Sequence, residues 1–408
     1  MKNLFPNFVE GSRVLTVPPA ESIGISRNTF MTSDDSPEFV ILPEGLKTIG
    51  ESAFRDWESL KGIYIPESVE RIEDRAFNCC SSLEYVKLPS SLISIGADAF
   101  AYSGLKSVMI PEGIKEIASG VFSGCNDLAT VVLPQSLEII AEEAFKGICA
   151  DSIDLPTNLR KIDKEAFMDG DLQKIVIPDS VEHIGDNAFS DNVLETIALP
   201  RRIEYWGQDI FSNSDYDLKR DCPELRLPDG VKAINEGEFQ YTGIQRLFIP
   251  ATVEVIHEEA FDSASIQEFI VDENNPRFAS VNGFLVDKDG QELIAAPLSD
   301  ILVIPEGVSI IGKNAFIMGG MDIIIFPSTI KTLGADMLEG DQQNMDLGFK
   351  SNSPEDIQLC KETFACYDVN KLYVPAGSIG DYREHPVFGG FDEIRAIDEL
   401  MEKIKKDI

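Results

Sequence analysis

The 408-residue chain is poor in histidine, in basic side chains and in long apolar runs. It has 3 histidines, and 35 Lys+Arg stand against 70 Asp+Glu, which gives a formal net charge of −35 at pH 7. Such a surface repels phosphate backbones and anionic lipid headgroups, so we expect no nucleic-acid partner. No run approaches the roughly 18 consecutive apolar residues of a membrane span, so we expect no membrane insertion.

The N-terminus begins M-K-N-L-F-P and lacks the apolar core of a secretory signal. As given, the sequence predicts a cytoplasmic protein, with secretion or cell-surface display as the alternative if a leader has been removed. Cysteine is sparse as well, with an odd number of residues and no C-x-x-C pair: Cys79, Cys80, Cys125, Cys149, Cys222, Cys360 and Cys366. These spacings argue against a disulfide framework and against structural zinc.

What the chain does have is an internal repeat, marked by prolines 22 or 23 residues apart: Pro43, Pro66, Pro89, Pro111, Pro134, Pro156, Pro178 and Pro200. Isoleucine dominates the sixth position after each proline, and phenylalanine fills the eleventh, after a small or aliphatic residue. A short alternating segment such as 60–65 precedes each proline. Period-two alternation predicts a strand, and a proline just past its end stops that strand because it lacks an N–H donor.

Each repeat therefore predicts one coil, made of a strand, a proline corner, a second apolar segment, a turn and an Ala-Phe pair that packs as a ladder. Glycine at the seventh position of several repeats, as at Gly96 and Gly185, predicts a turn with positive φ there. The template also fits Pro19, Pro228, Pro250, Pro305, Pro327 and, loosely, Pro354. About 14 coils then predict a single parallel β-sheet solenoid over residues 19–394, between an N-terminal cap at 1–18 and a helical tail at 395–408.

Two features depart from the repeat. Between Pro250 and Pro305, the dipeptides Asn282-Gly283 and Asp289-Gly290 are strong hairpin signals, so we expect a β-hairpin insert at about 276–297. Past Pro375, apolar residues recur every three or four positions: Phe391, Ile394, Ile397, Met401, Ile404 and Ile408. This spacing predicts an amphipathic C-terminal helix that caps the open end of the core.

The repeat unit at 110–128, which reads I-P-E-G-I-K-E-I-A-S-G-V-F-S-G-C-N-D-L, resembles the BspA-type (Treponema pallidum-type) leucine-rich repeat. The resemblance covers about residues 15–394, and the segments 275–297 and 372–394 are similar to the insert and the closing segment of bacterial members. It implies a leucine-rich-repeat solenoid from a bacterial, often secreted or cell-surface, adhesin-like protein. Some such proteins bind host matrix proteins, and the family has no shared catalytic residues.

The residues themselves also favour a non-catalytic protein. His183, His257 and His385 occupy different phases of the repeat, so they are not expected to converge. The segment 257–261 begins like a zinc motif, but Phe261 stands where the second histidine ligand is needed. Cys80 and Cys125 share one column and are expected to be small buried residues, whereas Cys79 is either an outward reactive thiol or inert, and the inert state is favoured. We expect no enzyme, no metal and no cofactor.

The outward row of the strands is the feature that can carry function. Side chains alternate across a strand, so the second residue before each proline faces away from the core. Its apolar members are our candidate binding residues: Tyr64, Met109, Val132, Val176, Phe248, Val303 and Ile325. An exposed apolar row can mark a binding strip, but strand propensity or covering loops explain the same residues equally well.

Two functional hypotheses follow from this row. The first is a monomeric, adhesin-like module that binds a protein or glycan through the strand face or the 276–297 insert. The alternative is a structural spacer rod without a dedicated binding site.

Overall fold

The computed structural model describes residues 5, 7–17, 37–194, 196–212, 224–240, 242–316, 321–334, 343–359 and 368–407. The chain splits into two compact units, Met1–Arg220 and Asp221–Ile408, which we describe separately. The coil expected at Pro19 and the last residue of the predicted helical tail, Ile408, lie outside the described residues. No helix in the described ranges is long and apolar enough to cross a membrane.

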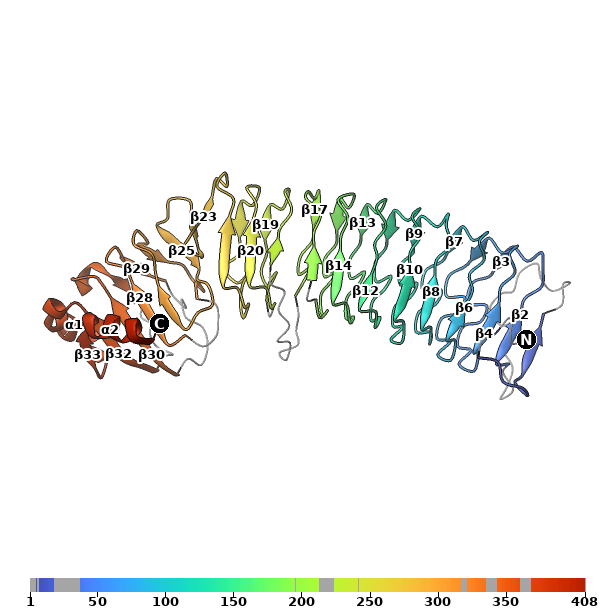
Figure 1. The fold of residues 1–408 in the computed structure, drawn as a ribbon, viewed down its shortest axis with the longest axis horizontal. Coiled ribbons are helices and arrows are strands. Elements are labelled where there is room, and N and C mark those ends of the chain that lie inside the picture. The colour runs from blue at the N-terminus through green and yellow to red at the C-terminus, as the bar shows by residue number, and fades with distance from the viewer. Residues whose placement is uncertain are drawn as a thin grey trace. The chain divides into compact units, whose positions relative to one another are not determined.

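Unit 1 is built from two rows of short parallel strands, and each coil gives one strand to each row (Figure 1). The first row precedes the prolines and comprises β1 (Val14–Thr16), β2 (Phe39–Ile41), β4 (Gly62–Tyr64), β6 (Tyr85–Val86), β8 (Ser107–Met109), β10 (Thr130–Val132), β12 (Ser152–Ile153), β14 (Lys174–Val176) and β16 (Thr196–Ala198). The second row follows the prolines and comprises β3 (Thr48–Ile49), β5 (Arg71–Ile72), β7 (Ser94–Ile95), β9 (Glu116–Ile117), β11 (Ile139–Ile140), β13 (Lys161–Ile162), β15 (His183–Ile184) and β17 (Tyr205–Trp206). The strand, corner and second apolar segment are thus confirmed for the coils from Pro43 to Pro200.

A ladder of phenylalanine rings fills the core of unit 1. From Phe54 to Phe211, neighbouring rings stack with centroids 5.0 to 6.0 Å apart. The residue before each phenylalanine is buried too, as at Ala76 and Ala144. The ladder is therefore confirmed, and it supplies the apolar burial that one coil alone lacks.

The glycines at the seventh position do not have positive φ, so that prediction is wrong. Left-handed backbone occurs two residues later instead, at Ser52, Arg75 and Asp98, with φ of 53°, 56° and 55°. A Cβ on Gly185 would clash with the Lys164 nitrogen and lie 2.7 Å from the Asp163 carbonyl carbon, in the preceding coil. Glycine is needed at Gly185 because the backbones of two coils approach closely.

Unit 2 repeats the two-row arrangement. Its first row contains β18 (Leu225–Arg226), β20 (Arg246–Ile249), β22 (Glu268–Val271), β26 (Ile301–Val303), β28 (Ile323–Phe326), β30 (Gln343–Phe349), β32 (Asp368–Val374) and β33 (Ile394–Ala396). Its second row contains β19 (Ala233–Ile234), β21 (Val255–Ile256), β25 (Glu292–Ala295), β27 (Ile310–Ile311), β29 (Thr332–Leu333) and β31 (Gln358–Leu359). All pairs within these rows are parallel.

The predicted hairpin insert is present as a small meander. Strands β23 (Phe278–Val281) and β24 (Phe284–Asp287) pair antiparallel, and β24 pairs antiparallel with β25. Asn282 and Gly283 both have positive φ, 53° and 84°, as a two-residue type I′ turn requires. Because β25 pairs parallel with β27, the insert returns the chain to the second row.

The C-terminal segment differs from the prediction in its bounds and in its role. Ile394 lies in strand β33, and helix α2 (Ile397–Asp407) begins only after it. Helix α1 (Ile379–Glu384) and the 3-10 helix η4 (Phe388–Gly390) bring the buried Tyr382 and Phe388 onto the core. Those two elements cover the end of the core, whereas α2 packs on the outer face of the strands through Leu400. Two further 3-10 helices are η2 (Pro354–Asp356) and η3 (Ala376–Ser378).

Candidate functional site

Three aliphatic side chains stand exposed on the outer face of the first strand row in unit 1. Met109 is 68% exposed, Val132 44% and Val176 64%. Met109 and Val132 are direct register partners on β8 and β10, and Val176 pairs with Ala198 on β16. We call Met109, Val132 and Val176 the aliphatic row. Their roles in binding stay a prediction.

Two other candidates, Tyr64 and Phe248, are half-buried, and polar side chains contact both of them. The Tyr64 hydroxyl donates to Glu44 Oε1 at 3.0 Å. Phe248 lies under the guanidinium of Arg226, whose Cζ is 3.4 Å from the ring centroid. Arg226 and Arg246 both pair with Glu224, so Phe248 sits within a cation–π and ion-pair cluster.

Ile325 was expected on an exposed face, and that expectation is wrong. Its side chain is 0% exposed because helix α2 covers it. Val303, its register partner on β26, remains 40% exposed. The same repeat position is therefore open at Val303 and covered at Ile325.

The sequence reasoning missed Tyr85, which is 40% exposed on β6. It lies four residues before Pro89 and pairs with Ser107. The prediction considered one outward position of each strand, whereas period-two alternation places the residue two before it on the same face. The alternation itself was the signal that identifies Tyr85.

The contact of α2 with the strands was also missed. Leu400 Cδ2 lies 3.2 Å from the place where a Cβ on Gly348 would stand, so this glycine leaves room for the leucine. Beside it, Lys403 Nζ is 3.7 Å from Asp346 Oδ2, and burial raises the pKa of Asp346. These contacts join segments about 55 residues apart, and local patterns do not report such pairings.

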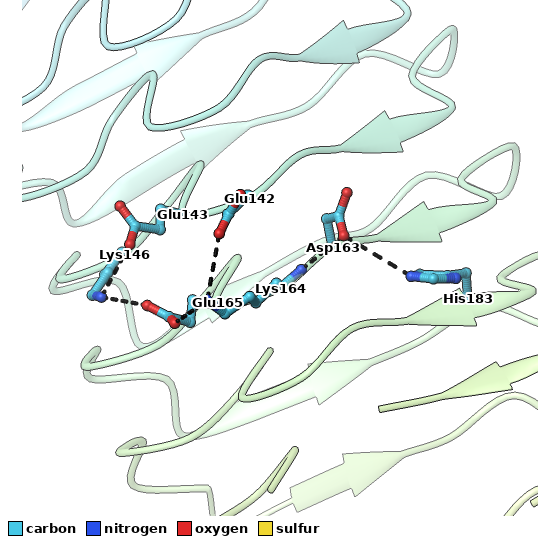
Figure 2. A network of polar contacts seen from close by, with 7 residues as sticks. All are labelled: Glu142, Glu143, Lys146, Asp163, Lys164, Glu165 and His183. Atoms are coloured by element: carbon cyan, nitrogen blue, oxygen red, sulfur yellow. Dashed lines mark hydrogen bonds and ion pairs between the residues drawn. The ribbon is translucent and has the colours of Figure 1, made fainter. Parts of the chain in front are cut away.

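A network of polar contacts crosses the coils of unit 1 near His183 (Figure 2). Lys146 lies 2.6 Å from Glu165 and 3.3 Å from Glu143, and Lys164 also pairs with Glu165. The hydrogen bond from Lys146 is the main reason that the pKa of Glu165 lies below its ordinary value. The Lys146–Glu165 pair joins two successive coils, as does the pair between Lys164 and Glu142 at 3.6 Å.

His183, at the edge of this network, contacts a tyrosine ring and a carboxylate. Its ring stacks on Tyr205 with centroids 4.3 Å apart, and its Nε2 is 4.0 Å from Asp163 Oδ1. Burial, with the charge of Lys161, lowers the pKa of His183. Figure 2 shows His183 joined to Asp163 at one end of the network that continues through Lys164 and Glu165.

The other candidate reactive groups are also engaged in structural contacts. His257 Nδ1 accepts a hydrogen bond from the Glu259 N–H, and His385 Nδ1 accepts from Val387 and Phe388. Across the part of the chain that the structure describes, no group of three His, Cys, Asp or Glu side chains is placed to hold a metal ion.

Of the described cysteines, Cys80 and Cys125 are small core residues, as predicted, whereas Cys79 and Cys149 are partly exposed. Cys80 and Cys125 are buried, and each thiol donates to a core carbonyl, Phe54 and Phe100, at 3.1 Å. Burial raises the pKa of Cys125 to about 11 and also raises that of Cys79, which lowers the thiolate fraction at neutral pH.

The BspA type Leucine rich repeat region, a pattern of six copies, matches residues 23–149, 93–218, 139–267 and 297–383. The chain belongs to the BspA-type leucine-rich repeat family. No protein of curated function matches it. The predicted leucine-rich-repeat solenoid is confirmed by this match together with the parallel strand rows.

Solved structures of bacterial leucine-rich repeat proteins resemble this BspA-type chain. A protein from Bacteroides ovatus is 20% identical, with 94% of this chain and 92% of that chain covered and a TM-score of 0.52, so the two share a fold. A leucine rich cell surface protein from Faecalibacterium prausnitzii is 22% identical over 91% and 89%, with a TM-score of 0.41. The T. pallidum leucine rich repeat protein is 24% identical over 48% and 82%, with a TM-score of 0.35.

Proposed function

We propose that this protein is a non-catalytic binding module whose ligand contacts the aliphatic row of unit 1. The observation that carries the proposal is the exposure of Met109, Val132 and Val176 at one repeated position of the first strand row. Burying a fully exposed Met or Val side chain contributes about 1.5–3 kcal/mol, and these three are 44–68% exposed, so covering each contributes about 0.7–2 kcal/mol. A partner that covers all three therefore offsets part of the cost of association.

The chemistry of the row favours a protein over a glycan. Its exposed members are aliphatic, whereas the aromatic side chains on the same face lie outside the row: Tyr64 is half-buried and bonded to Glu44, and Tyr85, which is 40% exposed, lies on the neighbouring strand β6. Serine and threonine fill the neighbouring outward positions, as at Ser107 and Thr130. Methionine and valine beside small polar side chains suit the apolar side chains of a protein segment.

The alternative is a structural spacer. The stacked phenylalanine ladder and the ion pairs between coils, such as Lys146 with Glu165, would suit a stiff scaffold. A spacer does not require an exposed aliphatic row, which is why we rank the binding module first. A spacer would show no saturable ligand.

The test is binding of the full chain to an array of matrix proteins, mucins and glycans. We expect saturable binding to a protein, with Met109→Asp and Val176→Asp each weakening it by about tenfold or more. The matched control is Ile93→Asp, since Ile93 is 52% exposed but lies beyond the Pro89 corner. Ligand binding that Met109→Asp and Ile93→Asp affect equally would refute the row as the site.

The insert is tested by substitution rather than by deletion. Strand β25 of the insert pairs with β27, so removing 276–297 would disrupt the fold along with the insert surface. Asp289→Lys changes an exposed residue of the insert turn instead. If Asp289→Lys abolishes binding while Met109→Asp does not, the insert is the site.

Compartment and oligomeric state are further expectations of this proposal. An adhesin-like role requires display outside the cell, and protease treatment of intact cells tests it by cleaving a displayed chain. We also expect a monomer, which sedimentation of the purified chain tests. A protected chain would favour the cytoplasmic location that the sequence predicts.

A further inference from the structure

One repeated position of the strand face occurs in two states within this chain. The second residue before the proline is exposed at Met109, Val132 and Val176 in unit 1. In unit 2 it is buried at Ile325 (0% exposed) and Tyr373 (5%). Helix α2 buries these two side chains, so an amphipathic helix already packs on the outer strand face in unit 2.

Helix α2 meets its strands through an apolar stripe with helical spacing. Ile397, Leu400 and Ile404 are buried against Ile323, Ile325 and Tyr373, and Met401 packs beside them. The 11 residues of α2 give a length of about 16 Å at 1.5 Å per residue. Strands lie about 4.8 Å apart, so α2 is long enough to cross three strand spacings.

A basic contact accompanies this stripe. Lys403 Nζ lies 3.7 Å from Asp346 Oδ2, and the Asp346 side chain is 12% exposed. Asp346 is on β30, two residues before Gly348, which faces Leu400. The strand surface under α2 is thus apolar with a carboxylate, and the helix packs on it through an apolar stripe with a lysine at the border of the stripe.

The aliphatic row also has a carboxylate among its apolar side chains. Met109, Val132, Asp154 and Val176 hold the same repeat position in four consecutive coils, and Asp154 is exposed. Four strands span three spacings, about 14 Å, which matches the length of an 11-residue helix. Both surfaces therefore combine three apolar side chains with one carboxylate, although under α2 the apolar residues are Ile323, Ile325 and Tyr373, and Asp346 is in register with Ile323.

We propose that the ligand segment on the aliphatic row is an amphipathic α-helix of about three turns. Its apolar stripe, spaced i, i+3, i+4 and i+7, packs on Met109, Val132 and Val176, and a lysine or arginine at the stripe's border faces Asp154. This inference rests on the proposed function, because it specifies the protein segment that the row binds.

The experiment titrates a fluorescent peptide with the sequence of residues 394–408 into the full-length protein. The protein's own α2 occupies the unit 2 surface, so the open row is the expected site. We expect saturable binding with a Kd below about 1 mM. Met109→Asp and Val176→Asp in the protein should each weaken it by about tenfold or more, while Ile93→Asp leaves it unchanged.

Two changes in the peptide test the stripe and the charge separately. Leu400→Asp in the peptide should abolish binding, because it places a charge in the apolar stripe. Asp154→Lys in the protein should weaken its binding of the wild-type peptide by about two- to fivefold, as expected for the loss of an exposed ion pair. Lys403→Glu in the peptide should then restore binding to the Asp154→Lys protein.

The outcomes separate this inference from the proposed function. Peptide binding that is absent, or that Met109→Asp does not change, overturns the helical ligand. The proposed function survives that result if Met109→Asp still weakens the ligand found on the array, which would then be an extended strand or a glycan. If Met109→Asp changes neither peptide nor array binding, both proposals are refuted.

Discussion

Replacing Leu400 by alanine should release helix α2 from the strand face. Leu400 is 0% exposed and lies against Gly348, Ile325 and Tyr373. A buried Leu→Ala change costs about 2–5 kcal/mol. Even the lower value shifts the equilibrium between docked and undocked α2 by about 30-fold. Because isolated helices shorter than about 12–15 residues are marginal in water, undocked α2 also loses its helical hydrogen bonds.

Hydrogen exchange measured by mass spectrometry detects the undocking of helix α2. We expect peptides over 397–407 to exchange about 30-fold faster or more in the Leu400→Ala protein. Glu402→Ala is the matched control, because Glu402 is exposed on the same helix and should change exchange little. Equal exchange in Leu400→Ala, Glu402→Ala and wild type would refute the claim that this apolar contact holds α2 in place.

Three further predictions concern the solenoid. Phe145→Ala should lower the free energy of unfolding of unit 1 by about 3–5 kcal/mol in urea titrations, because the Phe145 ring stacks between Phe122 and Phe167 with ring centroids 5.4 Å apart on each side. A loss under about 1 kcal/mol would contradict a packed ladder. Gly185→Ala should lower the free energy of unfolding by about 1–3 kcal/mol, because the added methyl group crowds the Asp163–Lys164 backbone. The control Gly380→Ala lies in helix α1, where no atom stands within 4 Å of the added methyl group, and should raise the free energy of unfolding by up to about 1 kcal/mol. Similar effects of the two changes would contradict the steric explanation. The folded state holds the pKa of Glu165 below 4.5, so the stabilisation from this carboxylate is present above pH 4.5 and is lost as the pH falls through its folded pKa. Urea titrations at several pH values should therefore show that Glu165→Gln reduces the acid sensitivity of unit 1. An unchanged pH dependence would contradict the Lys146–Glu165 interaction.

The repeat is predictable from the sequence because each coil buries the same columns. The proline spacing, the phenylalanine at the eleventh position and the period-two strands are local signals, and the structure confirms each of them. The Asn282-Gly283 turn is equally local, because its φ values follow from the two residue types.

The features that were not predicted depend on contacts between distant segments. Gly185 looks like a turn glycine in the sequence, but the reason for it is the backbone of the preceding coil. Ile325 follows the outward pattern, yet a helix that begins 72 residues later covers it. The apolar spacing through Ile394 and Ile397 suggests one helix, but pairing with β32 makes Ile394–Ala396 a strand.

Cooperativity between the two units stays a prediction. The continuous repeat predicts one unfolding transition, whereas the division at Arg220 and Asp221 would allow two. Calorimetry of the full chain distinguishes these cases, because a single solenoid gives one peak with equal calorimetric and van't Hoff enthalpies. Two resolved peaks would contradict the single domain over 19–394.

The most direct test of the central claim is site-specific photo-cross-linking of the ligand captured on the array. A benzophenone side chain is placed at position 132, within the aliphatic row, or at position 93, which is exposed outside it. The account predicts a ligand cross-link from position 132 and little from position 93. A cross-link from position 93 that equals or exceeds the one from position 132 would contradict the assignment of the aliphatic row as the binding face.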